Sequence, residues 1–481
     1  GHFRYILERI GPELRQYIVT DNDEERPFTR DQRRWVYSSA KRQNNRFGFG
    51  SDNEMERATN YLIIKHNAFP PIVDPEHSIE NAFTLDPFDV PAAKVIGQPR
   101  GRRHAFRPAS VINISGMSFG ALSGPAVEAL NRGALLAGCM QSTGEGGLSP
   151  YHRNGGDLIF QIGTGYFGCR DERGRFSLDH LEQTIAGAPV KAIEIKLSQG
   201  AKPGLGGILP GIKVTSEIAR IRDVPAGVDC ISPPGHTMFH DADGLLDFAE
   251  SIADRTGLPV GIKSAVGRLE FWRELADLMG DGERGVDFIV VDGGEGGTGA
   301  APLTFTDHVS LPLKIGLSRV FSIFAERDMD DRVTFVGSGK LGFPEAALMA
   351  FALGCDSVNV GREAMLSVGC IQSQRCHTDH CPTGVTTHKR WRTAGLRPES
   401  KSIRTANYIE TLRGELLALS RACGHVHPAL VGAGQLELVD GSFGSRTLSE
   451  VFNYQEDWGV PQGRRRNEIE SLMLEADSSP T

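Results

Sequence analysis

Several features that define other classes of protein are missing from this chain of 481 residues. It has no run of about 18 apolar residues, so the sequence contains no membrane-spanning helix. It has no excess of basic residues, and its net charge of −8 gives no support for binding nucleic acid. Five of its eight cysteines follow no repeating interval, so a disulfide framework is not expected. They are Cys139, Cys169, Cys230, Cys355 and Cys423. We expect them to be reduced core residues in a cytoplasmic protein.

The sequence also lacks a methionine at its start, because it begins with Gly1. We therefore expect that something upstream of Gly1 was removed, by design or by processing. Membrane association through such a segment stays open as an alternative to a purely cytoplasmic location.

The other three cysteines lie close together in the stretch CIQSQRCHTDHCPTG. Cys370, Cys376 and Cys381 have the spacing C-x5-C-x4-C, which is typical of an iron–sulfur binding loop because thiolates are the usual ligands of such clusters. The alternative, three buried thiols that cluster by chance, fits poorly with the polar residues between them. A fourth cysteine nearby is missing. We therefore expect a three-iron cluster, and the alternative is a cubane with a non-cysteine or solvent ligand on its fourth iron.

The middle of the chain alternates β-branched runs that end in Gly or Ser with helical stretches, which is the pattern of parallel β/α units. Eight runs are found: VINISGMS, GCMQSTGE, IFQIGTG, AIEIKLSQ, PVGIKSAVG, FIVVDGGEGG, VTFVGSGK and SVNVGRE. They predict an α/β fold, a (β/α)8 TIM barrel whose active site lies at the carboxyl ends of the strands. A doubly wound sheet is the competing fold. It would ordinarily place G-x-G-x-x-G after the first strand, where this chain has SGMSFG.

Three regions are expected on this basis. Residues 1–105 form an irregular N-terminal cap, residues 106–390 form the barrel with the iron–sulfur loop at 370–381, and residues 391–481 form a helical extension with a polar tail. The stretch ANYIETLRGELLALSRACGH predicts a helix in the extension, and the last twenty residues are expected to be frayed. An extra segment between the fourth and fifth strands is too long for an ordinary connection and indicates a functional loop.

The loops after the seventh and eighth strands, GSGKLG and VGRE, predict a phosphate site, since TIM barrels commonly bind phosphate there. Glycine backbone allows close approach of N–H groups to phosphate oxygens, and arginine adds a bidentate contact. The residues concerned are Gly337, Ser338, Gly339, Gly361 and Arg362. The alternative interpretation is tight-turn glycines beside a surface arginine.

From about Ser115 to Val385 the chain resembles the FMN-binding synthase domain of glutamate synthases. The resemblance is carried by SGMSFGALS, STGEGG, QGAKPG with its LPG and KVT continuation, ISPPGH, GGTGAAP and the cysteine loop with PTGV. It implies a (β/α)8 barrel and an oxidoreductase that acts on CH–NH2 donors. It also implies FMN as a cofactor and a [3Fe-4S] cluster on the three cysteines.

The resemblance further implies which residues contact the flavin. Met117 and Ser118 would lie along the isoalloxazine edge, with polar contacts from Ser142 and Gln161. Lys263 would be the catalytic cation near flavin N1 and O2, where it would stabilise the negative charge of the reduced ring. The alternative for Lys263 is a strand-end lysine that reaches solvent.

The stretch DGGEGGTG would bring glycine backbone to the ring or to its phosphate tail. These glycines are Gly293, Gly294, Gly297 and Gly299, and Asp292 before them would position a substrate or cap the loop.

Lys202 and Arg222 match the positions that bind the carboxylates of 2-oxoglutarate in the family, and two cations suit a dicarboxylate. The chain departs from the family pattern KPGEGGQLPG at Leu205 and Ile208. The keto acid is therefore held differently or another substrate is used.

The resemblance implies that an imino acid, formed from a 2-oxo acid and ammonia or an amine, is reduced to an amino acid. The alternatives are an amino-acid or N-substituted glutamate dehydrogenase running in reverse, and an electron-transfer flavoprotein subunit without a substrate of its own. The electron partner would be ferredoxin, an NAD(P)H-oxidising subunit or a quinone-linked protein. Gly1 cannot act as a glutaminase nucleophile, so a separate glutaminase is a further expected partner.

Overall fold

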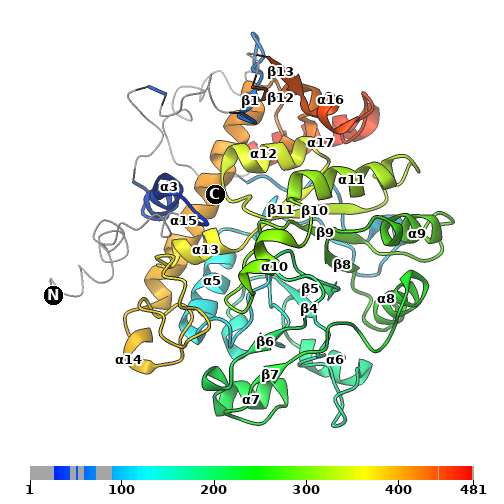
Figure 1. The fold of residues 1–481 in the computed structure, drawn as a ribbon. Coiled ribbons are helices and arrows are strands. Elements are labelled where there is room, and N and C mark those ends of the chain that lie inside the picture. The colour runs from blue at the N-terminus through cyan, green and yellow to red at the C-terminus, as the bar shows by residue number, and fades with distance from the viewer. Residues whose placement is uncertain (1–25, 44–49, 52–58, 72–88, 442–443, 479–481) are drawn as a thin grey trace.

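A closed barrel of eight parallel strands forms the centre of the molecule (Figure 1). The computed structural model describes residues 26–43, 50–51, 59–71, 89–441 and 444–478. The strands follow one another around the barrel in the order β10, β11, β2, β3, β4, β5, β8, β9. They are β2 (Ile112–Ile114), β3 (Gln141–Ser142), β4 (Leu158–Ile162), β5 (Val190–Lys196), β8 (Val260–Ala265), β9 (Phe288–Asp292), β10 (Thr334–Ser338) and β11 (Ser357–Val360). Each of the eight predicted runs overlaps one of these strands, so the predicted TIM barrel is confirmed.

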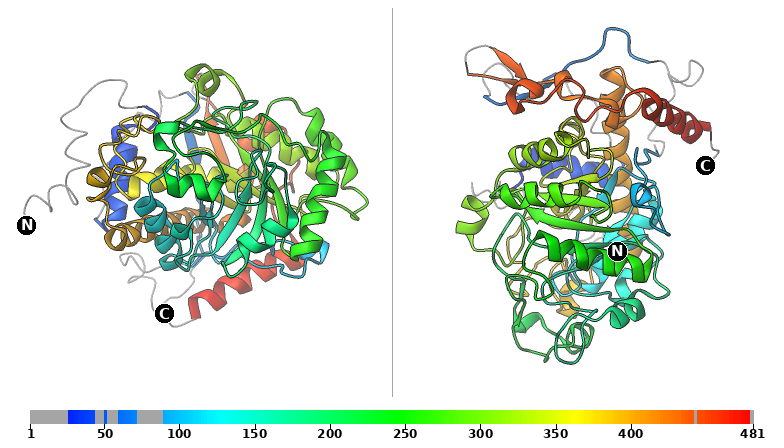
Figure 2. Two further views of the ribbon diagram at one scale, coloured as in Figure 1. Left: turned by 90° about the horizontal axis from the view of Figure 1, so that it is seen from below. Right: turned by 90° about the vertical axis from the view of Figure 1, so that its right-hand side faces the viewer.

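Helices cover the outside of the barrel, as Figure 2 shows. They are α5 (Gly124–Leu136), α6 (Leu178–Ile185), α8 (Ala242–Thr256), α9 (Glu270–Leu278), α11 (Leu313–Ala325), α12 (Pro344–Ala352) and α13 (Arg362–Ser367). The short helix α10 (Leu303–His308) has no buried residue and lies over the centre of the barrel in Figure 1. Helix α8 illustrates the local signals. Its N-cap Asp241 accepts a hydrogen bond from the Gly244 N–H at 2.8 Å, and it ends at Gly257, whose φ of 72° is easily reached only by glycine.

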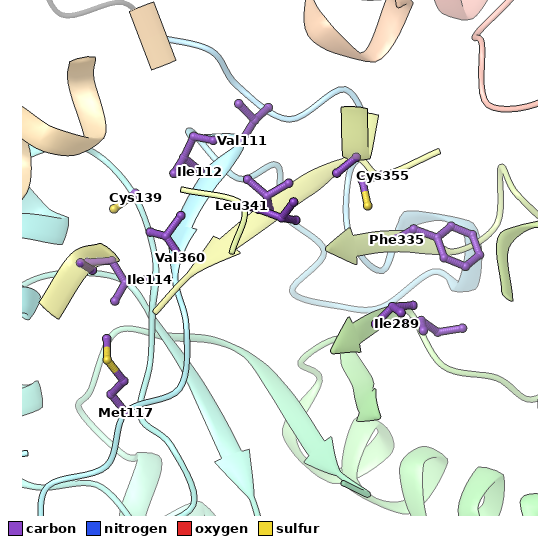
Figure 3. Close-up of a cluster of buried hydrophobic side chains, with 14 of the residues drawn as sticks. Val111, Ile112, Ile114, Met117, Cys139, Ile289, Phe335, Leu341, Cys355 and Val360 are labelled. Carbon is purple, nitrogen blue, oxygen red and sulfur yellow. The ribbon is translucent and has the colours of Figure 1, made fainter. Parts of the chain in front are cut away.

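Between the strands and these helices lies a continuous apolar core, part of which is drawn in Figure 3. Ile112, Phe335 and Val360 contribute to it from three barrel strands. The five scattered cysteines are all buried free thiols, as expected.

The inside of the barrel changes character along its axis. Side chains alternate in direction along a strand, so every second residue points inward. The lower apolar layer, toward the amino ends of the strands, consists of Ile159, Ala192, Phe288, Val290 and Val336. The next inward positions toward the carboxyl ends form the upper polar layer, which consists of Gln161, Glu194, Lys263 and Asp292. The polar layer lies where a TIM barrel places its active site.

The extra segment between β5 and β8 folds as a small lobe. It contains β6 (Ile208–Leu209), α7 (Ser216–Arg222) and β7 (Cys230–Ile231). The two strands are antiparallel, with Ile208 opposite Ile231 and Leu209 opposite Cys230. This pairing returns the chain toward the barrel and places the end of α7 near the carboxyl ends of its strands.

The regions outside the barrel are more regular than expected. The N-terminal region contains α3 (Arg30–Ala40) and β1 (Leu62–Ile64), and β1 pairs with β12 (Leu436–Val439), which pairs with β13 (Ser445–Thr447). The predicted C-terminal helix is found as α15 (Pro398–Ala422), flanked by α14 (Arg390–Thr393) and followed by α16 (Leu448–Phe452). The right-hand view of Figure 2 shows the three-stranded sheet at one end of the molecule.

The expectation of a frayed C-terminus is wrong for the described residues, because α17 (Gly463–Ser478) is helical. Two effects stabilise it. Ile469 and Met473 are buried one helical turn apart, and Arg464 pairs with Glu468 four residues later at 2.8 Å. No described helix has the length and apolar character needed to cross a membrane.

Candidate active site

The upper polar layer is a network of buried charges. The Lys263 ammonium lies 3.8 Å from the Asp292 carboxylate. The Gln161 amide donates a hydrogen bond to Glu194 from the neighbouring strand. Burial lowers the pKa of Lys263, but Asp292 and Glu194 outweigh burial, so its pKa is raised and the lysine stays charged. Lys263 does not reach solvent, since its side chain is only 8% exposed.

For Glu194, the effect of burial on the pKa outweighs the effect of the opposite charge nearby. Burial raises its pKa, and Lys263 and the Gln161 amide lower it only in part, so the net pKa is raised. Its Oε2 atom has no hydrogen-bond partner among the described residues. Buried polar atoms are nearly always satisfied. The upper polar layer is therefore suited to a bound ligand that donates a hydrogen bond to the Glu194 Oε2 atom.

The loop after β2 passes closely over this layer. A Cβ atom on Gly116 would lie 3.0 Å from both the Gln161 amide nitrogen and the Ser142 hydroxyl oxygen. Glycine at this position therefore lets the backbone of the following residues, Met117 and Ser118, approach the layer. The structure thus brings together all five residues assigned to the flavin contact, and each of them is buried.

Helix α7 of the inserted lobe contributes a cation to the same loop. The Arg222 guanidinium donates to the Ser118 hydroxyl at 3.2 Å and to the Phe119 carbonyl at 3.0 Å. Its Nε atom is buried and has no partner among the described residues. A second buried cation, Lys202, donates to the Gly206 carbonyl at 2.6 Å. Both cations are nearly inaccessible, with 5% and 3% exposure.

A carboxylate that sequence reasoning missed lies among these cations. Glu145, after β3, forms an ion pair with Lys196 of β5 at 2.9 Å. Burial raises the pKa of Glu145, but Lys196, Arg222 and Lys202 outweigh burial, so the pKa lies below its usual value. Glu145 is the present counter-ion of the cation group. Its signal in the sequence was a charged residue inside the glycine-rich motif STGEGG.

Leu205 and Ile208, which depart from the family pattern, lie on the surface of the inserted lobe. Their exposed fractions are 38% and 44%, in contrast to the buried cations. Ile208 lies opposite Ile231, which is 66% exposed. The departure therefore adds exposed apolar side chains to the inserted lobe and leaves Lys202 and Arg222 in place.

The two loops of the candidate phosphate site lie side by side, because β10 and β11 are neighbours in the barrel. Among the described residues, the backbone N–H groups of Gly339 and Gly361 have no hydrogen-bond acceptor. Arg362 donates to the Glu295 carbonyl. Gly337 has a packing role instead, since a Cβ atom there would lie 2.8 Å from Leu341 and 3.0 Å from the Cys355 sulfur.

The glycines after β9 serve mainly to hold loops together. The N–H groups of Gly293 and Gly294 donate to the carbonyls of Ser338 and Leu311 at 2.8 and 2.9 Å. A Cβ atom on Gly299 would lie 2.6 Å from the Cβ of Cys376. This loop is therefore in contact with the cysteine loop. Asp292 caps the start of the inserted lobe, where its carboxylate accepts from the Gly200 N–H at 2.8 Å.

Gly297, in the same loop, lies against Arg362. A Cβ atom on Gly297 would come within 2.6 Å of the guanidinium. Close packing accounts for glycine at both positions.

The three cysteines lie near enough to influence one another's ionisation. Cys376 and Cys381 raise the pKa of the Cys370 thiol, although burial raises it more. The backbone N–H of Gln372 donates to the Cys370 sulfur at 3.4 Å, and the Cys381 sulfur lies 3.6 Å from the Thr383 hydroxyl. Hydrogen bonds to sulfur suit thiolate ligands. Within the described residues, however, no three of the His, Cys, Asp and Glu side chains lie as close as a mononuclear metal site requires.

The N-terminal region holds this cysteine loop, a role that the sequence did not predict. The Tyr37 hydroxyl donates to the Cys370 carbonyl at 2.6 Å. The Gln372 side chain accepts from the Phe28 N–H at 2.9 Å and donates to the Phe28 carbonyl at 3.0 Å. These contacts join residues more than 300 positions apart in the sequence, so no local sequence pattern predicts them.

Comparison with known proteins identifies the family. A family model described as a conserved region in glutamate synthase matches residues 77–426. The chain belongs to the glutamate synthase family. The predicted glutamate synthase-like oxidoreductase is thereby confirmed at the level of the family.

Two relatives show the extent of this likeness. The chain is 38% identical over 452 residues to the glutamate synthase large subunit-like protein YerD of Bacillus subtilis, across 88% of this chain and 85% of that protein. It is 35% identical over 319 residues to the archaeal glutamate synthase (NADPH) of Methanocaldococcus jannaschii. That match covers 65% of this chain and 59% of the relative. The chain thus spans little more than half of the archaeal glutamate synthase.

Among solved structures, the flavin-binding domain of baker's yeast flavocytochrome b2 is a distant neighbour of this glutamate synthase family member. It has a TM-score of 0.48 and 16% identity, with 100% of this chain and 95% of that chain covered.

Proposed function

We propose that this chain binds FMN over the upper polar layer and forms an amino acid from a 2-oxo acid and ammonia or an amine. FMN, when bound, supplies the hydride that reduces the carbon–nitrogen double bond of the imino acid. The observation that carries the proposal is the contact of Arg222 with Ser118 at 3.2 Å. It joins a candidate substrate cation to a candidate flavin residue in one buried site.

Lys263 supplies the fixed positive charge of this site. It stays protonated in a buried place because two carboxylates, Asp292 and Glu194, face it. A preorganised cation stabilises negative charge that develops beside it, and it needs no reorganisation during the reaction. Gln161 fixes the position of Glu194 and so the field that Lys263 experiences.

Lys202 and Arg222 are proposed to bind the two carboxylates of 2-oxoglutarate. Charge-assisted hydrogen bonds of this kind are the strongest that a protein offers to a dicarboxylate. Glu145 occupies the same cation group and must share or release its partners when the substrate enters. The substrate carboxylates thereby replace Glu145 as partners of the cations. Pairing with these cations lowers the free-energy cost of removing the substrate carboxylates from water.

The phosphate of FMN is proposed to lie at Gly339 and Gly361. Their N–H groups have no acceptor among the described residues, and Arg362 lies at the beginning of α13. The residues proposed for the ring, the phosphate and the substrate lie in the carboxyl-terminal halves of barrel strands, follow these strands or belong to the inserted lobe. This is the arrangement expected for a TIM-barrel active site.

Cys370, Cys376 and Cys381 are proposed to hold a [3Fe-4S] cluster that carries single electrons to and from the site. The contact of Gly299 with Cys376 supports the assignment, because it places the cysteine loop against a loop of the active site. Replacing Cys376 by Ser is expected to remove the cluster's iron and its paramagnetic resonance signal, while most FMN stays bound. Iron content equal to that of the wild-type protein would contradict the ligand assignment.

An N-substituted glutamate dehydrogenase is the second candidate, and the exposed apolar side chains of the inserted lobe favour it. Leu205, Ile208 and Ile231 are exposed there, and they would accept an alkyl group on the substrate nitrogen better than ammonia. The cation pair and the fixed lysine serve both directions of the reaction equally.

Both functions are tested by an anaerobic titration of the reduced, FMN-loaded protein. We expect the flavin absorbance to recover when 2-oxoglutarate is added together with ammonia or methylamine, and not with either alone. Faster recovery with methylamine identifies the second candidate. No recovery with any pair of substrates would contradict both and would indicate an electron-transfer subunit.

A further inference from the structure

Lys213, the lysine of the motif KVT, is a buried cation to which the proposed function assigns no role. It ends the short helical turn η5 (Gly211–Lys213) of the inserted lobe, and its exposed fraction is only 2%. Its ammonium group donates to the Ala121 carbonyl at 2.7 Å and to the Cys376 carbonyl at 3.1 Å. One buried charge therefore contacts both the loop after β2 and the cysteine loop.

No carboxylate neutralises this charge directly. Within the described residues, the Lys213 ammonium donates to the two carbonyls and forms no ion pair. Burial disfavours its charged form, and the negative groups that favour it are Cys376, Asp379 and Cys381. The Asp379 carboxylate already accepts a hydrogen bond from the Thr387 hydroxyl at 2.9 Å. A buried charge without an ionic partner is costly, so this position suits an anionic group held by the neighbouring thiolates.

The contact with Ala121 is one of two adjacent contacts that join the loop after β2 to the region of the cysteines. The preceding carbonyl, that of Gly120, lies 2.9 Å from the Nε2 atom of His388. The backbone N–H of His388 donates in turn to Asp379 of the cysteine loop at 2.8 Å. The ammonium of Lys213 is therefore held at a fixed place between the candidate flavin loop and the candidate cluster loop.

Charge beside an iron–sulfur cluster affects its reduction potential. A three-iron cluster with three thiolate ligands is already negative when it is oxidised, and it becomes more negative when it takes up an electron. A fixed cation nearby therefore stabilises the reduced form more than the oxidised form, and the effect is strong where water is excluded. Lys213 meets both conditions, because it is buried and is held by two hydrogen bonds, one of them to the backbone of Cys376.

We propose that Lys213 is the counter-ion of the cluster on Cys370, Cys376 and Cys381 and that its charge raises the reduction potential of this cluster. The inference rests on the proposed function, because it requires that the three cysteines hold the cluster. In each reduction the cluster gains one electron from a one-electron donor. Lys213 keeps its proton and transfers no electron, so it acts through its fixed charge alone.

The test is a redox titration of the full chain, loaded with FMN and iron, at neutral pH. Dithionite and ferricyanide set the ambient potential through mediators, and the paramagnetic resonance signal of the oxidised cluster is followed. Lys213→Met removes the charge, and Lys213→Gln removes it but keeps a hydrogen-bond donor. In both variants the ratio of reduced to oxidised cluster at a fixed ambient potential should fall by about tenfold or more, which lowers the potential by about 59 mV or more. Lys213→Arg keeps the charge and should stay close to the wild type.

Lys389→Met is the matched control. Lys389 also lies beside the cysteine loop, where its ammonium is 3.2 Å from the His380 ring nitrogen, but this contact is exposed to solvent. Solvent and salt screen such a charge, so the same ratio should change by less than about twofold. Equal shifts in Lys213→Met and Lys389→Met would overturn the proposal, because total charge would then account for both. A wild-type potential in Lys213→Gln would also overturn it, because hydrogen bonding and not charge would then set the potential.

Iron analysis of the same samples separates a failure of this inference from a failure of the proposed function. Iron-free wild-type protein contradicts the proposed cluster and this inference with it. Iron-loaded Met and Gln variants of Lys213 with the wild-type potential contradict this inference alone. Folded variants of both kinds that contain no iron would likewise overturn it, because Lys213 would then be needed to bind the cluster and not to set its potential.

A second measurement needs no variant and decides the question if neither neutral variant folds. In a crystal structure of the iron-loaded wild-type protein, the Lys213 ammonium should remain on the Cys376 carbonyl, with no carboxylate or solute anion paired with it. An ammonium that is paired with such an anion would be neutralised independently of the cluster, and this result would overturn the proposal.

Discussion

The two layers inside the barrel use the same strands for opposite purposes. On β9, Phe288 and Val290 belong to the lower apolar layer and Asp292, the next inward residue, to the upper polar layer. On β5 the inward residues pass from Ala192 to Glu194 in the same way. The lower layer is stabilised by removal of apolar surface from water, which tolerates changes of shape. The upper layer is stable only while each charge keeps its partner, and it therefore supplies specific chemistry.

The largest expected effect is a loss of stability caused by a substitution in the lower apolar layer. Replacing Phe288 by Ala removes a buried ring and leaves a cavity, which typically costs about 3–5 kcal/mol of unfolding free energy. Urea denaturation would measure the loss. Activity per folded molecule should persist, because no charged partner is removed. The matched control is Phe69→Ala, whose ring is 89% exposed and whose loss should cost below about 0.5 kcal/mol.

The upper layer should respond in the reverse manner. Lys263→Met keeps most of the side-chain volume and removes the charge between Asp292 and Glu194. The rate of flavin reoxidation by substrate should fall by about 10²–10³-fold, as when one oxyanion donor is removed. Lys191→Met is the control, since Lys191 is on β5 but its side chain is 42% exposed. A normal rate in Lys263→Met would show that the charged layer is only structural.

A smaller effect is expected at the edge of the upper layer. Arg222→Ala removes one charge-assisted contact to the proposed dicarboxylate, which is worth about 1.5–3 kcal/mol. The binding constant for 2-oxoglutarate should therefore weaken by about ten- to a hundredfold. Arg220→Ala, two residues away on α7 and exposed, should leave it unchanged. Unchanged binding in the Arg222 variant would assign the inserted lobe a structural role.

The smallest effect, counted per pH unit, concerns a buried group that has no opposite charge beside it. Burial lowers the pKa of His427 to about 4 from 6.5, in contrast to the raised pKa of Lys263. Its ring is held neutral, with one nitrogen 2.8 Å from the Pro91 carbonyl and the other accepting from the Ala429 N–H at 3.0 Å.

The sign of the pH dependence follows from these values. The unfolded chain takes up a proton on this histidine before the folded one does, so stability falls as pH falls from 6.5 toward 4. The loss should be about 1 kcal/mol per pH unit in this window. In the variant His427→Gln, the free energy of unfolding, measured in urea at several pH values, should no longer show this dependence on pH. A variant with the slope of the wild type would refute the assignment.

The strands could be predicted because most of them combine a β-branched run with a terminal glycine or serine, both of which are local signals. Met117, Ser142 and Lys263 could be placed at strand ends for the same reason. Glu145 and Lys196 could not, because their significance lies in an ion pair that forms only when the barrel closes. The contacts of Phe28 and Tyr37 with the cysteine loop, and the pairing of β1 with β12, likewise join residues that are far apart in sequence.

The central claim is that the upper polar layer and the loops above it form the flavin site. The most direct test is a crystal structure of the FMN-loaded protein. We predict the ring over Gln161 and Lys263, and the phosphate within hydrogen-bonding distance of the N–H groups of Gly339 and Gly361. A flavin bound elsewhere, or a phosphate held away from these two glycines, would contradict the account.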